Sequence, residues 1–249
     1  MIRLKNDKQI SEIRKSCKLL AQMFEYVIPK VTVGISTKDI DDLCLEFITK
    51  HGGKPAWYKE DFPGAACVSV NDAVIHGLPS RKIKIRDGDL VSIDVGIDLN
   101  GYISDSSTTV MVGNVAPEHK RLVEVTRKCL EAGIAACKVG NRIRDISKAV
   151  SAIAEEAGFG VVYEYCGHGV GLGVHEDPSI PNVVCKGISP RIQPGMVLAI
   201  EPMINIGLPD VDLADDGWTV LTADGLYSAH EEHTVAVFKD HTEILTKLD

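Results

Sequence analysis

The stretch Gly167–His168–Gly169–Val170–Gly171–Leu172–Gly173–Val174–His175–Glu176–Asp177–Pro178 combines backbone freedom and titratable side chains more densely than any other part of the chain. Its four glycines alternate with other residues and are framed by two histidines. Because glycine costs conformational entropy in a regular strand or helix, the pattern predicts that the backbone approaches another group closely here. A histidine pair beside two carboxylates indicates a functional site.

The composition around this stretch is that of an ordinary globular protein, with 45% apolar and 25% charged residues in 249. A formal net charge of −8 argues against a free-standing nucleic-acid-binding module. The chain has no run of 18 apolar residues and no apolar segment at its N-terminus, so we expect a cytoplasmic protein without a membrane span. Seven cysteines without a C-x-x-C pair argue against a disulfide framework and a zinc knuckle.

The first half of the chain predicts two helices and a strand. Apolar residues recur at three- and four-residue spacing over 7–27, which is typical of an amphipathic helix. A second helix is expected to follow, because Ser36 and Asp39 have the spacing of a capping box and Gly52 supplies a stop signal. Residues 67–70 are expected to form a strand.

A strand hairpin with two aspartates on one face is expected next. Residues 89–97 alternate between apolar and polar, and Asn100–Gly101 is a strong signal for a two-residue turn. With that turn, Asp94 pairs with Ser107 and Asp105 with Gly96, so the aspartates are diagonal neighbours with α-carbons roughly 7–8 Å apart. Two carboxylates this close require a cation, a proton or full solvation.

The second half repeats this order of elements. A long helix is expected from Pro117, and a shorter one from about Asn141 that stops at Gly158. These matches predict pseudo-repeat halves of about 1–115 and 116–249 within a single domain of 1–249, with a site at their shared interface. The matching positions, at offsets of 106 or 107, are Gly34 and Gly140, Asp39 and Asp145, Gly52 and Gly158, Gly88 and Gly195, and Asp94 and Glu201.

Three further strands are expected over 161–166, 196–204 and 228–237. If the duplicated strands stand in one sheet, four carboxylates and one imidazole converge, from Asp94, Asp105, Glu201, Glu232 and His168. Four negative charges match two divalent cations, and the oxygen-rich donor set suits Mn, Fe or Co better than a structural zinc. Two such ions roughly 3.5–4 Å apart would activate a bridging water and polarise a carbonyl, and these are the two functions needed to hydrolyse an amide.

Other catalytic motifs are missing. No G-x-S-x-G elbow occurs, and no G-x-x-x-x-G-K-[ST] or G-x-G-x-x-G follows a strand and opens a helix. The sequence therefore favours metal-dependent chemistry over a serine nucleophile or a phosphate-binding loop.

With these residues in hand, the chain resembles type I methionine aminopeptidases, whose pita-bread fold is shared with prolidases and aminopeptidase P. The resemblance implies an α+β fold of pseudo-twofold duplicated halves, with a central, mostly antiparallel sheet and helices on its outer face. It implies a metalloaminopeptidase that hydrolytically removes N-terminal methionine from nascent proteins and peptides, preferably when the second residue is small. The likeness runs through almost the whole chain and rests on Asn71–Pro79, Ile93–Gly96 with Gly101–Ser106, Gly167–Asp177, Ile200–Met203 and Glu232–Thr234.

The resemblance also implies roles for individual residues. Two divalent ions would be held by Asp94, Asp105, His168, Glu201 and Glu232, with Asp105 and Glu232 bridging and the water between the ions as nucleophile. Glu201 would also shuttle the proton of that water.

Two histidines and an apolar pocket would meet the substrate. His76 and His175 would face the peptide, with His175 donating to the scissile carbonyl and its developing oxyanion. The methionine pocket would be formed by Phe62, Cys67 and Trp218. Many relatives carry an aromatic residue where this chain has Val174, so a wider pocket with relaxed preference is a hypothesis for this chain.

Two alternative functions stay open at this point. A proline-specific peptidase of the same fold, related to prolidase or aminopeptidase P, is disfavoured because the chain reads Glu201–Pro202–Met203 and leaves no room for the N-terminal domain of that class. A non-catalytic peptide-binding or ribosome-binding homologue would have lost ligands, whereas all five positions are filled. Type II methionine aminopeptidases carry a helical insertion, but only 25 residues separate His175 from Glu201.

We therefore expect a monomer that takes a nascent polypeptide or peptide N-terminus as its substrate. Transient contact with the ribosome is expected, and binding to DNA or to a membrane is not.

Overall fold

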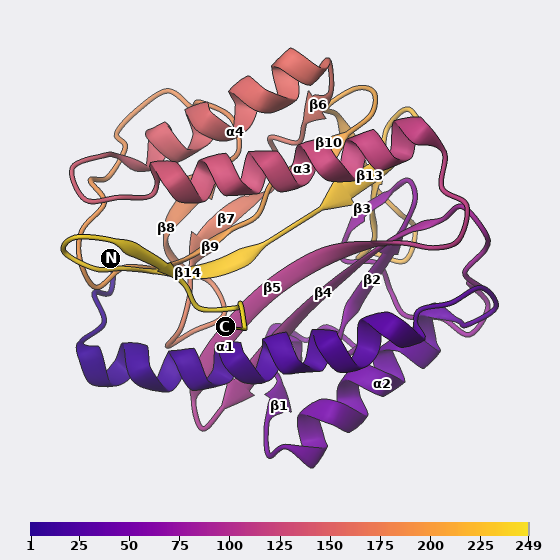
Figure 1. Cartoon of the computed structure of the whole chain (residues 1–249), viewed down its shortest axis with the longest axis horizontal. Coiled ribbons are helices and arrows are strands. Elements are labelled where there is room, and N and C mark those ends of the chain that lie inside the picture. Colours follow the sequence, from indigo (N-terminus) through magenta and orange to yellow (C-terminus); the bar gives the residue numbers. More distant parts are fainter. Residues whose placement is uncertain (249) are drawn as a thin grey trace.

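Two pairs of helices flank the strands in the computed structural model, which describes residues 1–248 (Figure 1). The first pair is α1 (Asp7–Val27) with α2 (Thr37–Lys50), and the second is α3 (Pro117–Ala136) with α4 (Ile143–Ala157). These are the four helices that apolar periodicity predicts. Two short 3-10 helices, η1 (Ile28–Lys30) and η2 (Ala56–Glu60), complete the helical elements of the described residues.

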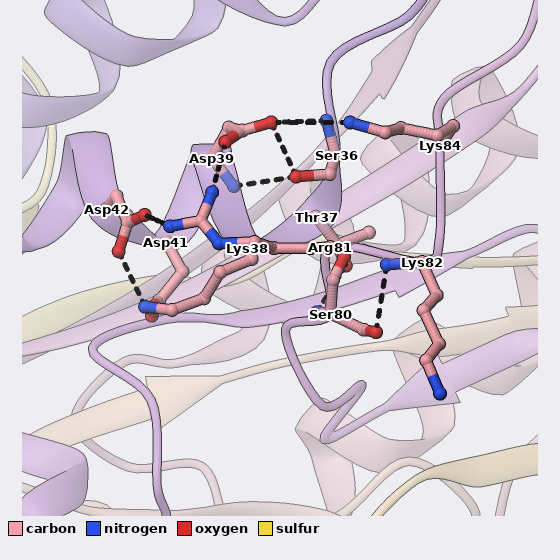
Figure 2. Close-up of polar contacts among 10 residues, drawn as sticks. All are labelled: Ser36, Thr37, Lys38, Asp39, Asp41, Asp42, Ser80, Arg81, Lys82 and Lys84. Atoms are coloured by element: carbon pink, nitrogen blue, oxygen red, sulfur yellow. Dashed lines mark hydrogen bonds and ion pairs between the residues drawn. The ribbon is translucent and has the colours of Figure 1, made fainter.

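The predicted capping box at the start of α2 is present. The Ser36 hydroxyl accepts the Asp39 amide (3.1 Å), and the Asp39 carboxylate accepts the Ser36 amide (2.9 Å). Figure 2 shows that Arg81 then binds Asp39 and Asp42 with separate nitrogens, at 3.0 and 2.9 Å. The capped helix start is thereby tied to the segment that leads into the hairpin.

Matching glycines of the two halves adopt the same left-handed backbone. The isolated bridge from Ser36 to Lys84 also has a counterpart from Arg142 to Arg191. Because only glycine adopts such φ angles without strain, the shared turns support the duplication predicted for the fold. The φ angles are +95° and +99° at Gly34 and Gly140, +79° and +76° at Gly52 and Gly158, and +94° and +89° at Gly88 and Gly195.

The first sheet is built on the predicted hairpin. Strands β4 (Leu90–Leu99) and β5 (Tyr102–Met111) are joined at Asn100 and Gly101, whose φ angles of 56° and 87° fit a hairpin turn. Strands β1 (Lys54–Pro55) and β2 (Cys67–Val70) both pair with β4. The apolar side chains of β4 pack against α1 and α2, so the aspartates are left on the other face.

The second sheet has five strands in the order β15-β14-β9-β7-β8, and every pair is antiparallel. Apolar residues of β9 and β14 pack against α3 and α4, which repeats the arrangement of the first half. The strands are β7 (Cys166–Gly169), β8 (Glu176–Pro181), β9 (Val197–Ile200), β14 (His233–Val237) and β15 (Thr242–Ile244).

Two small sheets of three strands lie beside these. One has the order β13-β10-β6 and the other β11-β12-β3. Their strands are β3 (Ala73–Ile75), β6 (Gly160–Val161), β10 (Met203–Asn205), β11 (Val211–Leu213), β12 (Val220–Thr222) and β13 (Ser228–His230). All their pairs are antiparallel.

Each of the three strands predicted for the second half is interrupted. The strand predicted over 161–166 is wrong, because β6 ends at Val161 and β7 begins only at Cys166. The strand predicted over 196–204 breaks between β9 and β10, where Pro202 has no N–H to donate. The strand predicted over 228–237 breaks between β13 and β14.

Within residues 1–248 the large sheets of the two halves are not joined into one continuous hydrogen-bonded ladder. The two large sheets instead meet along β5 and β14, which lie side by side in Figure 1. Thr234 Oγ1 donates to the carbonyl oxygen of Asp105 (2.7 Å) and accepts its amide (3.2 Å). The predicted α+β class, antiparallel pairing and duplicated halves are confirmed. No helix among residues 1–248 is long and apolar enough to cross a membrane.

Candidate metal centre

The hairpin places two aspartates toward one cavity. The register is the predicted one, with Asp94 opposite Ser107 and Asp105 opposite Gly96. Both aspartates are buried and line the same cavity. Because the main chain of Asp105 is bonded to Thr234, the first half of the site is fixed to the second.

The glycine stretch brings the backbone close to its neighbours, as predicted. A β-carbon on Gly167 would lie 2.4 Å from the Ala199 carbonyl oxygen, and one on Gly169 would lie 2.4 Å from that of Asp177. His168 lies between these glycines on β7, so its position depends on both close contacts. Residues 170–175 leave the sheet, with Gly171 at φ +123°, before β8 begins.

This excursion brings the two histidines together. The rings of His168 and His175 are 4.5 Å apart between centroids, at 66° to one another. The backbone between the two histidines therefore turns back on itself and does not continue as a straight strand. His168 is buried, whereas the His175 side chain is 55% exposed and its Nδ1 lies 3.6 Å from Glu60 Oε2.

The two glutamates occupy the strand interruptions. Glu201 follows β9 directly, and Glu232 lies between β13 and β14. The Glu232 amide donates to the Ser107 carbonyl oxygen (2.9 Å), while the neighbouring Glu231 forms an ion pair with Arg127 (3.0 Å). At both positions the chain passes from one sheet to another, and this change of direction points Glu201 and Glu232 into the cavity.

All five predicted ligands line one cavity of about 390 Å³. One donor atom each from Asp105, His168 and Glu232 lies within 4.8 Å of the others. His168 Nε2 is 3.4 Å from Glu201 Oε1 and 3.6 Å from Asp105 Oδ2. Asp94 completes the set from the neighbouring strand.

The chemistry of these residues fits divalent cations. Buried oxygens of Asp94, Asp105 and Glu232 have no hydrogen-bond partner among the described residues, although a buried unpaired oxygen costs about 1–3 kcal/mol. Burial raises the pKa of Asp94 to about 7, and burial together with neighbouring carboxylates raises the pKa values of Asp105, Glu201 and Glu232. Bound cations would satisfy the oxygens and remove the repulsion.

Burial keeps the nearby imidazoles neutral. It lowers the pKa of His168 to about 4, with a further contribution from His175, and it lowers the pKa of His76 to about 4 for the same two reasons. A neutral imidazole has a free lone pair for a metal, as His168 would need.

The residues predicted for the methionine pocket lie in the cavity wall. Phe62, Cys67 and Trp218 all line it, and the rings of Phe62 and Trp218 meet edge to face at 5.3 Å. Val174 is buried in the same apolar cluster as these three residues. His76 also lines the cavity, in a left-handed conformation with φ 55°.

Sequence reasoning missed several residues of this region. Trp57 and Tyr165 line the cavity, and the Trp57 indole donates to the Asp94 carbonyl oxygen (3.3 Å). His230 is buried beside Glu201, neither of its ring nitrogens has a hydrogen-bond partner within residues 1–248, and burial lowers its pKa to about 3. A sequence signal exists for His230, because the continuous strand predicted over 228–237 would place it on the same face as Glu232.

The model of the Peptidase_M24 family, described as metallopeptidase family M24, matches residues 11–239 of the chain. The chain belongs to metallopeptidase family M24. It is 58% identical to the methionine aminopeptidase of Treponema pallidum, over 99% of this chain and 97% of that protein. It is 42% identical to methionine aminopeptidase 1 of Bacillus subtilis, with both chains fully covered.

Solved structures agree with this placement. The methionine aminopeptidase of Rickettsia prowazekii superposes with a TM-score of 0.96 at 38% identity, covering 99% of this chain and all of that one. The prolidase of Pyrococcus furiosus reaches 0.81 at 26% identity and covers 99% of this chain but 66% of its own. The predicted resemblance to methionine aminopeptidases and the predicted fold are confirmed, and membership of the family implies divalent metal ions.

Proposed function

We propose that this M24 protein is a methionyl aminopeptidase that hydrolyses N-terminal methionine from nascent proteins and peptides, preferably before a small second residue. The observation that carries the proposal is the convergence of four carboxylates and one imidazole, from both halves, on a cavity with an apolar wall. The relatives named methionine aminopeptidase support the choice of substrate.

We propose that two divalent ions would be held by Asp94, Asp105, His168, Glu201 and Glu232. Mn, Fe and Co suit this oxygen-rich set. Ions bound there supply Lewis acidity and a water of lowered pKa. Within the protein, Glu201 accepts the proton of the attacking water and passes it to the leaving amine.

The two histidines beside the cavity act on the peptide. We assign to His175 the hydrogen bond to the scissile carbonyl oxygen, because its exposed ring lies 4.5 Å from that of His168. His76, neutral through its lowered pKa, contacts the substrate from the opposite half of the chain. Phe62, Cys67 and Trp218 receive the methionine side chain.

The same-fold alternative has less support. A proline-specific peptidase would share the ligand set, but the chain is only 26% identical to the prolidase of Pyrococcus furiosus, against 58% to the methionine aminopeptidase of Treponema pallidum. A non-catalytic binding protein would not need five converging donors. We further propose that the enzyme works as a cytoplasmic monomer with transient ribosome contact, where new N-termini emerge.

Peptide release by metal-depleted protein reloaded with Mn, Fe or Co tests the proposal. Methionine should be released from Met-Ala-Ser faster than leucine from Leu-Ala-Ser, and faster than methionine from Met-Val-Ser. Glu201→Gln should remove activity, whereas Glu155→Gln on the exposed surface of α4 should retain it. Preferred cleavage of X-Pro peptides would establish the prolidase alternative, and no turnover with any ion would establish the binding protein.

A further inference from the structure

His230 is a buried imidazole that the proposed mechanism does not use. Its side chain is 2% exposed, and neither ring nitrogen has a hydrogen-bond partner among residues 1–248. Buried polar atoms in proteins are nearly always bonded, so two unpaired nitrogens on one ring require an explanation.

The main chain holds His230 firmly on two sides. It pairs with Met203 in the β10–β13 ladder. Its amide donates to Thr109 Oγ1 (3.1 Å), and its carbonyl oxygen accepts the same hydroxyl (2.9 Å). The ring is therefore presented from a rigid backbone that is bonded to β5, the strand of Asp105.

The nearest charged group to the ring is a proposed metal ligand. His230 Nε2 lies 3.7 Å from Glu201 Oε2, and the other oxygen of the same carboxylate lies 3.4 Å from His168 Nε2. Glu201 is thus contacted by a different imidazole at each oxygen. A movement of about 0.8 Å would bring the His230 nitrogen and Glu201 oxygen to the usual hydrogen-bond distance of about 2.9 Å.

We infer that His230 is a positioning residue whose Nε2–H donates to Glu201 Oε2 and orients that carboxylate for metal binding. The inference rests on the proposed metal centre. Metal-binding carboxylates commonly accept a hydrogen bond from a neighbouring group, and loss of such a group typically weakens metal affinity about 10–100-fold. The neutral ring supplies one donor and adds no charge to the site.

Two substitutions separate the hydrogen bond from the space that the ring fills. His230→Gln keeps an N–H donor, whereas His230→Leu keeps a similar volume without one. Co²⁺ is titrated into each metal-depleted variant by calorimetry, the visible spectrum of the bound Co²⁺ is recorded, and peptide release is measured. His119→Leu removes an imidazole that stacks on Tyr227 outside the cavity wall and serves as the matched control.

We expect His230→Leu to weaken Co²⁺ binding about 10–100-fold and to alter the Co²⁺ spectrum, while His230→Gln stays within about threefold of wild type. Thermal unfolding of the metal-free variants identifies any variant that fails to fold. If His230→Leu fails to fold, the Co²⁺ affinity of His230→Gln alone tests the inference. Wild-type Co²⁺ affinity in His230→Leu would overturn the inference.

An equal loss in both variants would also overturn it, because the site would then need the imidazole itself as a ligand. Failure of the proposed function looks different, since the wild-type protein itself would bind no Co²⁺ or release no methionine.

Discussion

Replacing Lys5 with methionine should destabilise the protein strongly, because Lys5 forms a buried ion pair with Glu176. Glu176 is the residue that follows His175 in the sequence. The two charged groups are 3.0 Å apart, and their side chains are 1% and 3% exposed. The other Glu176 oxygen accepts the amides of Leu172 and Gly173, at 2.7 and 2.9 Å. This ion pair therefore anchors the segment that carries His175.

The magnitude follows from the burial. Lys5→Met leaves the Glu176 carboxylate buried without its counter-charge, and breaking one partner of such a pair costs about 3–5 kcal/mol. Each kcal/mol lowers Tm by about 2–4 °C in a chain of this size, so we expect a fall of roughly 6–20 °C. Lys15 is the matched control, because its pair with Glu12 is 61% and 30% exposed. Such a pair contributes at most about 1 kcal/mol.

Thermal unfolding followed by circular dichroism at fixed pH and metal concentration measures both variants. Lys15→Met should shift Tm by less than about 4 °C. The double variant Lys5→Met with Glu176→Gln should recover part of the loss, because it removes the uncompensated charge. If Lys5→Met and Lys15→Met have the same Tm, the buried ion pair does not contribute several kcal/mol to stability, and the reasoning is refuted.

Three further predictions concern the metal centre. His168→Ala should abolish peptide release and lower metal content measured by plasma emission, because a ligand is lost; wild-type values for both would contradict the ligand assignment. His175→Ala should lower kcat by about 10²–10³-fold with unchanged metal content, and a change confined to KM would contradict its role at the oxyanion. In metal-free protein burial raises the pKa of Asp94 to about 7, so this carboxyl binds more protons in the folded state than in the unfolded chain between about pH 4 and 7, and its contribution to stability becomes less favourable as pH rises through that window. The gain in Tm that Asp94→Asn gives to metal-free protein should therefore be larger at about pH 7 than at about pH 5, and an equal or smaller gain at pH 7 would show that burial does not destabilise this carboxylate.

The hairpin and helix starts could be predicted because their signals are local. Asn100 and Gly101 adopt positive φ, and Ser36 and Asp39 cap their own helix, so neighbouring residues determine each structure. The hairpin register then placed Asp94 and Asp105 correctly. Each of these features depends on residues within about 20 positions of one another.

Alternation does not reveal where a strand changes partner, and of the three interruptions only the one between β9 and β10 contains a proline, Pro202, that could signal it. Residues 196–204 remain mostly apolar on both sides of Pro202, yet β9 and β10 belong to different sheets. Trp57 was missed for a related reason. It comes from the short helix η2, and only the close approach of that helix to Gly96 brings its indole to the cavity.

The two large sheets meet along β5 and β14, so ions bound there would connect the two halves of the chain. Asp94 and Asp105 come from one half, whereas His168, Glu201 and Glu232 come from the other. Ions held by this set would act as a non-covalent cross-link, analogous to a disulfide between two lobes. Metal loading should therefore slow amide hydrogen exchange in both halves together, and neither half expressed alone should bind the ions as the whole chain does.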